Sequence, residues 1–141
     1  MPDMLAPAPE APTTTPLPGF SSGAALLDAE RLDCYRIALE FQALTSHLVP
    51  RRHQATLRDQ LERASVSIVL NIAEGAGRAS PADKARFYAM ARGSATECAA
   101  VLDLLWARGL IDARLRIRAR SLIVRIVQML TRLLARMMLH L

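Results

Sequence analysis

The chain of 141 residues is long enough for one domain with a sizeable core and short for two, so we expect a single domain. Its residues are 52% hydrophobic and only 4% aromatic. They are rich in Leu, Ala, Ile, Val and Met and show no strand-like alternation, a composition that suits packed helices better than sheets. The net charge is +5, but residues 1–30 carry four acids and no base, so the remainder carries 18 bases against 9 acids, or +9.

The first 24 residues are predicted to be a Pro- and Thr-rich disordered arm. Six of the eight prolines fall within residues 1–18, where neither a helical nor a strand period is found. A solvated tail is the default interpretation of this arm, and binding to a groove on a partner is the alternative. The folded domain is then expected over residues 25–141.

Helical periodicity begins at about residue 25 and predicts four long helices with short connections. Apolar spacing and end signals place these helices over about residues 26–48, 54–75, 81–108 and 112–140. The expected fold class is all-α, an antiparallel up-down-up-down four-helix bundle.

Local signals mark the ends of the predicted helices. Pro50 stops the first helix, and Gly75 and Gly77 are expected to end the second in the left-handed turn that favours glycine. The third helix is expected to begin with Ser80 as its capping residue and Pro81 at its first position. Gly109 is expected to end it, and Asp112 to cap the fourth helix.

The two cysteines, Cys34 and Cys98, are expected to be buried free thiols, because no CxxC motif or Cys/His cluster accompanies them. The first residues lack the pattern of a signal peptide, and no uncharged run reaches the roughly 18 to 20 residues of a membrane span. We therefore expect a soluble, cytoplasmic protein that does not enter membranes.

Five arginines of the last predicted helix form one basic face, here called the arginine stripe. At 100° per residue they fall within about 40° of one another, and they are Arg114, Arg118, Arg125, Arg132 and Arg136. No acid follows Asp112, so nothing later in this helix neutralises them.

One interpretation of the arginine stripe is a surface that binds nucleic-acid phosphates. The other is a solvated face, or a face that pairs with acids of a neighbouring subunit. The preference for Arg over Lys fits phosphate binding and a GC-rich genome equally well.

The apolar positions of the same helix spread over about half of its circumference, wider than one bundle core needs. This surplus predicts a second buried contact, most simply with another copy of the chain. A helix lying on a membrane surface is the less favoured alternative, because three partner helices already offer a core. The positions are Leu115, Leu122, Ile123, Ile126, Leu130, Leu133, Leu134 and Met137.

Polar residues near the end of the second helix raise the question of their partners. Glu74 lies where it opposes the helix dipole, so an arginine is expected beside it, either Arg78 or Arg92. In the third helix, "GSATE" supplies two small residues expected to let the two helices approach closely, followed by an acid; these are Gly93, Ser94 and Glu97. A polar layer that fixes the register of the helices is favoured over a catalytic role for Asn71 and Glu74.

The stretches "QLERASVSIVLNIAEGAGRAS" and "ARFYAMARGSATECAAVLDLL" resemble the bacterial four-helix-bundle family of 23S rRNA-intervening-sequence proteins, which includes the accessory variability determinants of diversity-generating retroelements. The resemblance covers nearly all of residues 30–140. It implies a homopentamer that forms a barrel with a basic surface and, in the retroelement branch, binding of RNA or DNA and of a reverse transcriptase. The residues matching the family signature are implied to be structural: Asn71, Glu74, Gly75, Arg78, Phe87, Gly93, Ser94 and Glu97.

The favoured function is a non-enzymatic oligomeric adaptor that binds RNA or an RNA–protein assembly through its arginines. An oligomeric protein-interaction scaffold without a nucleic-acid role is the alternative. An enzyme is least favoured, because the sequence has no Glu-x-x-His pair, no evident base near Cys98 in sequence and no glycine-rich phosphate loop. No cofactor or metal is expected.

Overall fold

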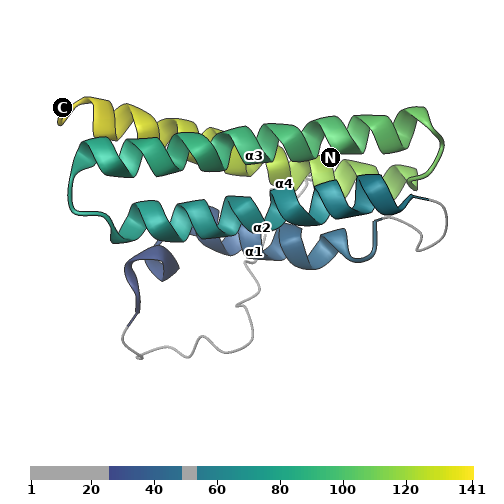
Figure 1. Ribbon diagram of the computed structural model, residues 1–141, viewed down its shortest axis with the longest axis horizontal. Helices are drawn as coiled ribbons and strands as arrows, with labels where there is room; N and C mark the ends of the chain where they lie inside the picture. Colours follow the sequence, from purple (N-terminus) through teal and green to yellow (C-terminus); the bar gives the residue numbers. More distant parts are fainter. Residues whose placement is uncertain (1–25, 49–53) are drawn as a thin grey trace, which may run out of the picture.

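The computed structural model describes residues 26–48 and 54–141, and all of its regular elements are helices. A short 3-10 helix, η1 (Asp28–Arg31), precedes four α-helices. Figure 1 shows the long helices lying roughly side by side. Their bounds are α1 (Asp33–Thr45), α2 (Ala55–Gly77), α3 (Pro81–Ala107) and α4 (Ala113–Met138). The predicted arm lies outside the described residues, as does Pro50.

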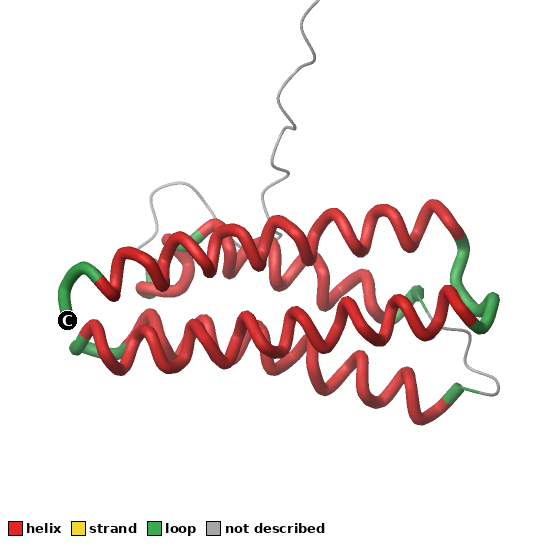
Figure 2. The backbone as a smooth tube through the Cα atoms, turned by 90° about the horizontal axis from the view of Figure 1, so that it is seen from above, coloured by secondary structure: helices red, strands yellow, loops and turns green. Residues whose placement is uncertain are grey.

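Each long helix packs against two others around one core. α2 contacts α1 and α3, and α4 also contacts α1 and α3. Figure 2 shows the same arrangement from above, with the C-terminus at one end of the bundle. No helix within the described residues has the length and apolar character needed to cross a membrane. The expected four-helix all-α fold is therefore confirmed at the level of its helices.

The prediction of one continuous first helix is wrong, because the helical conformation is interrupted at Leu32. Leu32 has extended backbone angles and separates η1 from α1. The Glu30 carboxylate accepts a hydrogen bond of 2.7 Å from the backbone N–H of Leu27, which closes the 3-10 turn. At the other end, the Thr45 and Ser46 hydroxyls donate to carbonyls three residues earlier, and α1 stops at Thr45.

α2 ends at Gly77, as its two glycines predict, but without the left-handed turn that was expected there. Neither Gly75 nor Gly77 adopts a left-handed conformation, and α2 continues through Gly77. Instead, the ammonium group of Lys84 donates to the carbonyl oxygens of Gly75 and Ala76, at 3.3 and 2.8 Å. The Gly75 carbonyl also accepts from the backbone N–H of Arg78 at 3.2 Å, so Lys84 adds a second donor there and supplies a side-chain donor to the carbonyl of Ala76.

The signals around α3 act as the sequence predicts. The Ser80 hydroxyl accepts from the backbone N–H of Asp83 at 3.1 Å, with Pro81 at the first helical position. Gly109 has φ +67°, and the N–H of Leu110 donates to the carbonyl of Leu105 at 2.9 Å, a Schellman end.

The wide apolar face of α4 is largely covered by the chain's own helices. Leu122, Ile123, Ile126 and Leu130 are buried in the core. The other four positions, near the two ends of α4, are half-buried and pack against that core; they are Leu115, Leu133, Leu134 and Met137. The width of this face therefore follows in large part from packing within one chain.

Candidate nucleic-acid interface

The arginine stripe lies on the accessible side of α4. Arg114, Arg118, Arg132 and Arg136 are exposed, and Arg125 is half-buried. Residues at the core-facing positions of the same helix, such as Ile126, are buried. The 3.6-residue period of α4 therefore separates the guanidinium groups of the stripe from the core.

The charge of the stripe is not neutralised within residues 26–48 and 54–141. No ion pair or side-chain hydrogen bond there involves any of its five guanidinium groups. Asp112 is used as a cap, since its carboxylate accepts from the backbone N–H groups of Arg114 and Leu115 at 2.9 and 3.2 Å. The stripe is thus free to receive anions from outside the chain.

Arg116, which is not part of the stripe, is held differently. Its guanidinium lies 3.6 Å from the Asp103 carboxylate and 4.6 Å from the centroid of the Trp106 ring. Trp106 is 45% exposed, whereas Tyr88, also on α3, is buried. Arg116 therefore connects α4 to α3. Its guanidinium, unlike those of the arginine stripe, is already paired within the chain.

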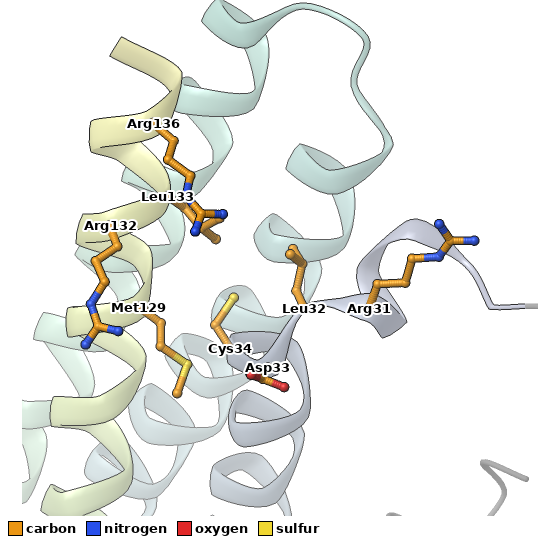
Figure 3. Close-up of a pocket in the computed structure, with 8 residues that line it drawn as sticks. All are labelled: Arg31, Leu32, Asp33, Cys34, Met129, Arg132, Leu133 and Arg136. Atoms are coloured by element: carbon orange, nitrogen blue, oxygen red, sulfur yellow. The ribbon is translucent and has the colours of Figure 1, made fainter. Parts of the chain in front are cut away.

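A cavity of about 300 Å³ opens at the C-terminal end of the stripe, between the η1–α1 junction and α4. Arg132 and Arg136 belong both to the stripe and to this α1–α4 cavity. Figure 3 shows the side chains of Arg136, Leu133 and Met129 on the α4 side and Leu32 and Cys34 opposite, while Arg31 extends away from the cavity. The full lining is Arg31, Leu32, Asp33, Cys34, Met129, Arg132, Leu133 and Arg136.

The α1–α4 cavity keeps its positive charge at neutral pH. Burial raises the pKa of the Cys34 thiol to about 11, so the thiol remains protonated and uncharged. The carboxylate of Asp33 lies 3.6 Å from Arg36, and its side chain is 78% exposed. The guanidinium groups of the cavity therefore face neither a thiolate nor a buried carboxylate.

The sequence model of the 23S rRNA-intervening sequence proteins matches residues 30–132, which include α1, α2, α3 and most of α4. The chain belongs to this family. A comparison with curated proteins gives no match.

A polar bridge connects α2 and α3 and includes Asn71 and Ser94, two residues for which the sequence resemblance implied a structural role. The Asn71 amide donates to the Ser67 carbonyl at 2.9 Å and lies 3.0 Å from the Ser67 hydroxyl. The Ser67 and Ser94 hydroxyls are 2.9 Å apart. The bridge links the two helices through Ser67 and Ser94, and the polar layer of Asn71 and Glu74 stays a prediction. Ser67 was not predicted, although its spacing of four residues from Asn71 was the available signal.

Three more residues that the resemblance named, Glu74, Arg78 and Phe87, join the end of α2 to α3. Glu74 forms an ion pair with Arg78, one of the two partners expected, whereas Arg92 donates to the Thr131 hydroxyl at 3.3 Å. The Arg78 guanidinium also lies over the Phe87 ring, 4.8 Å from its centroid. The Glu74 and Arg78 side chains are 50% and 40% exposed, so this is a surface pair.

The close approach of α2 and α3 occurs at Gly75, not at Gly93. A Cβ atom at Gly75 would lie 2.8 Å from the Cε1 atom of Tyr88 and 3.1 Å from the Cβ atom of Phe87. A Cβ atom at Gly93 would meet nothing within 4 Å, and Gly93 is exposed. The expectation that Gly93 brings the helices together is therefore wrong, and Ser94 contributes a hydrogen bond instead.

Glu97 lines a smaller polar hollow of about 190 Å³ between α2 and α3, together with Arg63, Ser67 and Ser94. The described residues contain no group of three His, Cys, Asp or Glu side chains placed to hold a metal ion. On this face the hydrogen bond between the Ser67 and Ser94 hydroxyls links the two helices.

Proposed function

We propose that the protein is a non-enzymatic, oligomeric adaptor that binds RNA, or an RNA–protein assembly, through the arginine stripe of α4. The supporting observation is the set of five accessible or half-accessible arginines that make no ion pair within the described residues. Guanidinium groups match the geometry of phosphate oxygens and can bind them bidentately. Contacts of this kind depend on the phosphate backbone and carry little sequence information.

The assembly in this proposal is a barrel of five up-down-up-down bundles. Like charges along one helix face destabilise a protein unless an outside partner compensates them. Five copies of the segment that follows residue 30 would carry about +45, which attracts a polyanion over distances longer than a single contact. For an RNA–protein assembly, the resemblance to retroelement proteins implies a reverse transcriptase as the protein partner.

The proposal is tested by replacing three stripe arginines and comparing RNA affinity with a charge-matched control. Arg118, Arg125 and Arg132 are changed together to Gln. The control variant changes three arginines outside the stripe, namely Arg63, Arg108 and Arg120. Both variants lose the same charge, so only the position differs. We expect the stripe variant to bind unrelated RNA sequences much more weakly than the control variant.

If both variants lose affinity equally, RNA responds to net charge alone and the stripe is not the binding surface. If the stripe variant keeps its RNA affinity while the oligomer becomes less stable, the stripe serves contacts between subunits. That second outcome favours a protein-interaction scaffold.

A further inference from the structure

The α1–α4 cavity lies where the arginine stripe ends, and the two features share Arg132 and Arg136. Its inner wall is apolar, since Leu32, Met129 and Leu133 line it and Cys34 at its base is only 2% exposed. A cavity of about 300 Å³ is at the lower end of the range of about 300–1,000 Å³ found for small-ligand sites. Its lining thus combines apolar side chains with three arginines and one carboxylate, that of Asp33.

A phosphate held by the stripe at Arg132 would place the attached sugar and base beside this cavity. A base that is paired and stacked within a duplex is not available to such a site, whereas an unpaired base can be turned out of the stack. Apolar side chains and guanidinium planes are suitable surfaces for the face of a base. The neutral Cys34 thiol adds no charge that would repel the phosphate, and the Asp33 carboxylate, which also lines the cavity, lies 3.6 Å from the Arg36 guanidinium.

We infer that the α1–α4 cavity receives one unpaired nucleotide of the bound RNA, with its phosphate at Arg132 and Arg136 and its base against Leu32, Met129 and Leu133. This inference rests on the proposed function and extends it, because it assigns a class of RNA. The preferred RNA contains a bulge, a loop or a single-stranded end. The site recognises the presence of an unpaired base, and the stripe holds the flanking backbone.

The test compares two RNA hairpins that differ only in one unpaired adenosine inserted into the stem. Fluorescence anisotropy at fixed moderate salt gives the affinity of the full-length protein for each hairpin. We expect the bulged hairpin to bind more tightly by about tenfold, the scale of one base contact. Equal affinities for the two hairpins would overturn the inference.

Variants then locate the preference within the chain. Leu133→Trp fills the cavity and should abolish the preference for the bulged hairpin while leaving binding of the paired hairpin in place. Leu134→Trp is the matched control, because Leu134 is also half-buried on α4 but does not line the cavity. If Leu133→Trp fails to fold, Leu32→Ala, which removes part of the apolar wall, should reduce the preference. An unchanged preference in a folded cavity variant overturns the inference.

Two further arms separate this inference from its alternatives. Arg114→Gln removes a stripe arginine outside the cavity and should weaken both hairpins equally; if it weakens neither, the proposed function fails as well. Adenosine monophosphate is added alone as a probe of a free nucleotide. Loss of adenosine monophosphate binding in Leu133→Trp would show that this nucleotide occupies the cavity. If it does so while the two hairpins bind equally, the ligand is a free nucleotide and the assignment to RNA is overturned.

Discussion

The guanidinium of Arg78 lies 4.8 Å from the centroid of the Phe87 ring, which connects the turn after α2 to the first part of α3. Arg86 lies at the same distance from this ring, so two cations contact one aromatic side chain. Arg78 also pairs with Glu74 on α2. One network of contacts therefore links Glu74, Arg78 and Phe87 at one end of the bundle.

Replacing Phe87 should destabilise the protein more than replacing Glu74. Phe87→Leu keeps much of the apolar volume but removes two cation–π contacts, and should lower the free energy of unfolding by about 1–2 kcal/mol. Glu74→Ala breaks a half-exposed ion pair and should cost only about 0.5 kcal/mol. Urea unfolding measures both values. A loss of several kcal/mol for Glu74→Ala would mean that the pair is buried in the assembled protein.

The two glycines on facing helices should respond in opposite directions to alanine. Gly75→Ala forces a Cβ atom against the Tyr88 ring and should lower the free energy of unfolding by about 1–3 kcal/mol. Gly93→Ala adds a methyl group in open space within a helix and should raise it by up to about 1 kcal/mol. Thermal unfolding at fixed protein concentration compares the two. If Gly93→Ala is destabilising, another chain approaches α3 at that position.

Burial of the two thiols predicts a loss of stability at high pH. The pKa is raised from 9.0 to about 11 for Cys34 and to about 12 for Cys98, so the unfolded chain releases these protons at a lower pH than the folded protein. Their contribution to the free energy of unfolding should be constant below about pH 9 and should decrease as the pH rises toward 11. Urea unfolding with a reductant measures this.

Cys98→Ala is the control for the pH experiment and should show a smaller decrease between pH 9 and pH 11. Burial also raises the pKa of Tyr88, from 10.0 to about 12. The decrease in stability that comes from Tyr88 should therefore remain in the Cys98→Ala variant. Rapid alkylation of both thiols in the native protein at neutral pH would contradict the burial on which this prediction depends.

The sequence predicts features that depend on neighbouring residues and misses those that depend on distant ones. Ser80, Gly109 and Asp112 act within one turn of their own position, so their roles follow from local chemistry. The role of Gly75 depends on Tyr88, and the carbonyl groups near it are paired by Lys84 on another helix. The glycine pair therefore marks the end of α2, at Gly77, but the left-handed turn expected there does not form.

The candidate site shows the same division. The stripe follows from the helical period of one segment, and its arginines are accessible along α4. The α1–α4 cavity is lined by Leu32 and Cys34 and by residues of α4 that lie about 100 positions later in the sequence. It forms where the extended residue Leu32 separates η1 from α1. The hydrophobic pattern of the sequence does not reveal this interruption of the helix, because Leu32 is itself apolar like its neighbours in the pattern. The cavity was therefore not predictable from periodicity.

Assembly into a closed oligomer is a separate prediction. Light scattering of the full-length protein at moderate salt should give the mass of five chains. The described helices cover much of the apolar face of α4 within one chain, so this measurement decides whether a second interface exists. A stable monomer at micromolar concentration would remove the barrel from the proposal and leave the stripe on a single bundle.

The salt dependence of RNA binding tests the central claim most directly. Removing one arginine that binds a phosphate should reduce the slope of log affinity against log salt by about one unit, because fewer counterions are released. For the variant in which Arg118, Arg125 and Arg132 are all Gln, we therefore predict a slope shallower by about two to three units than that of the unchanged protein, in an intact oligomer. The charge-matched variant at Arg63, Arg108 and Arg120 should keep the original slope. An unchanged slope in the stripe variant would contradict the proposal that this face binds the phosphate backbone.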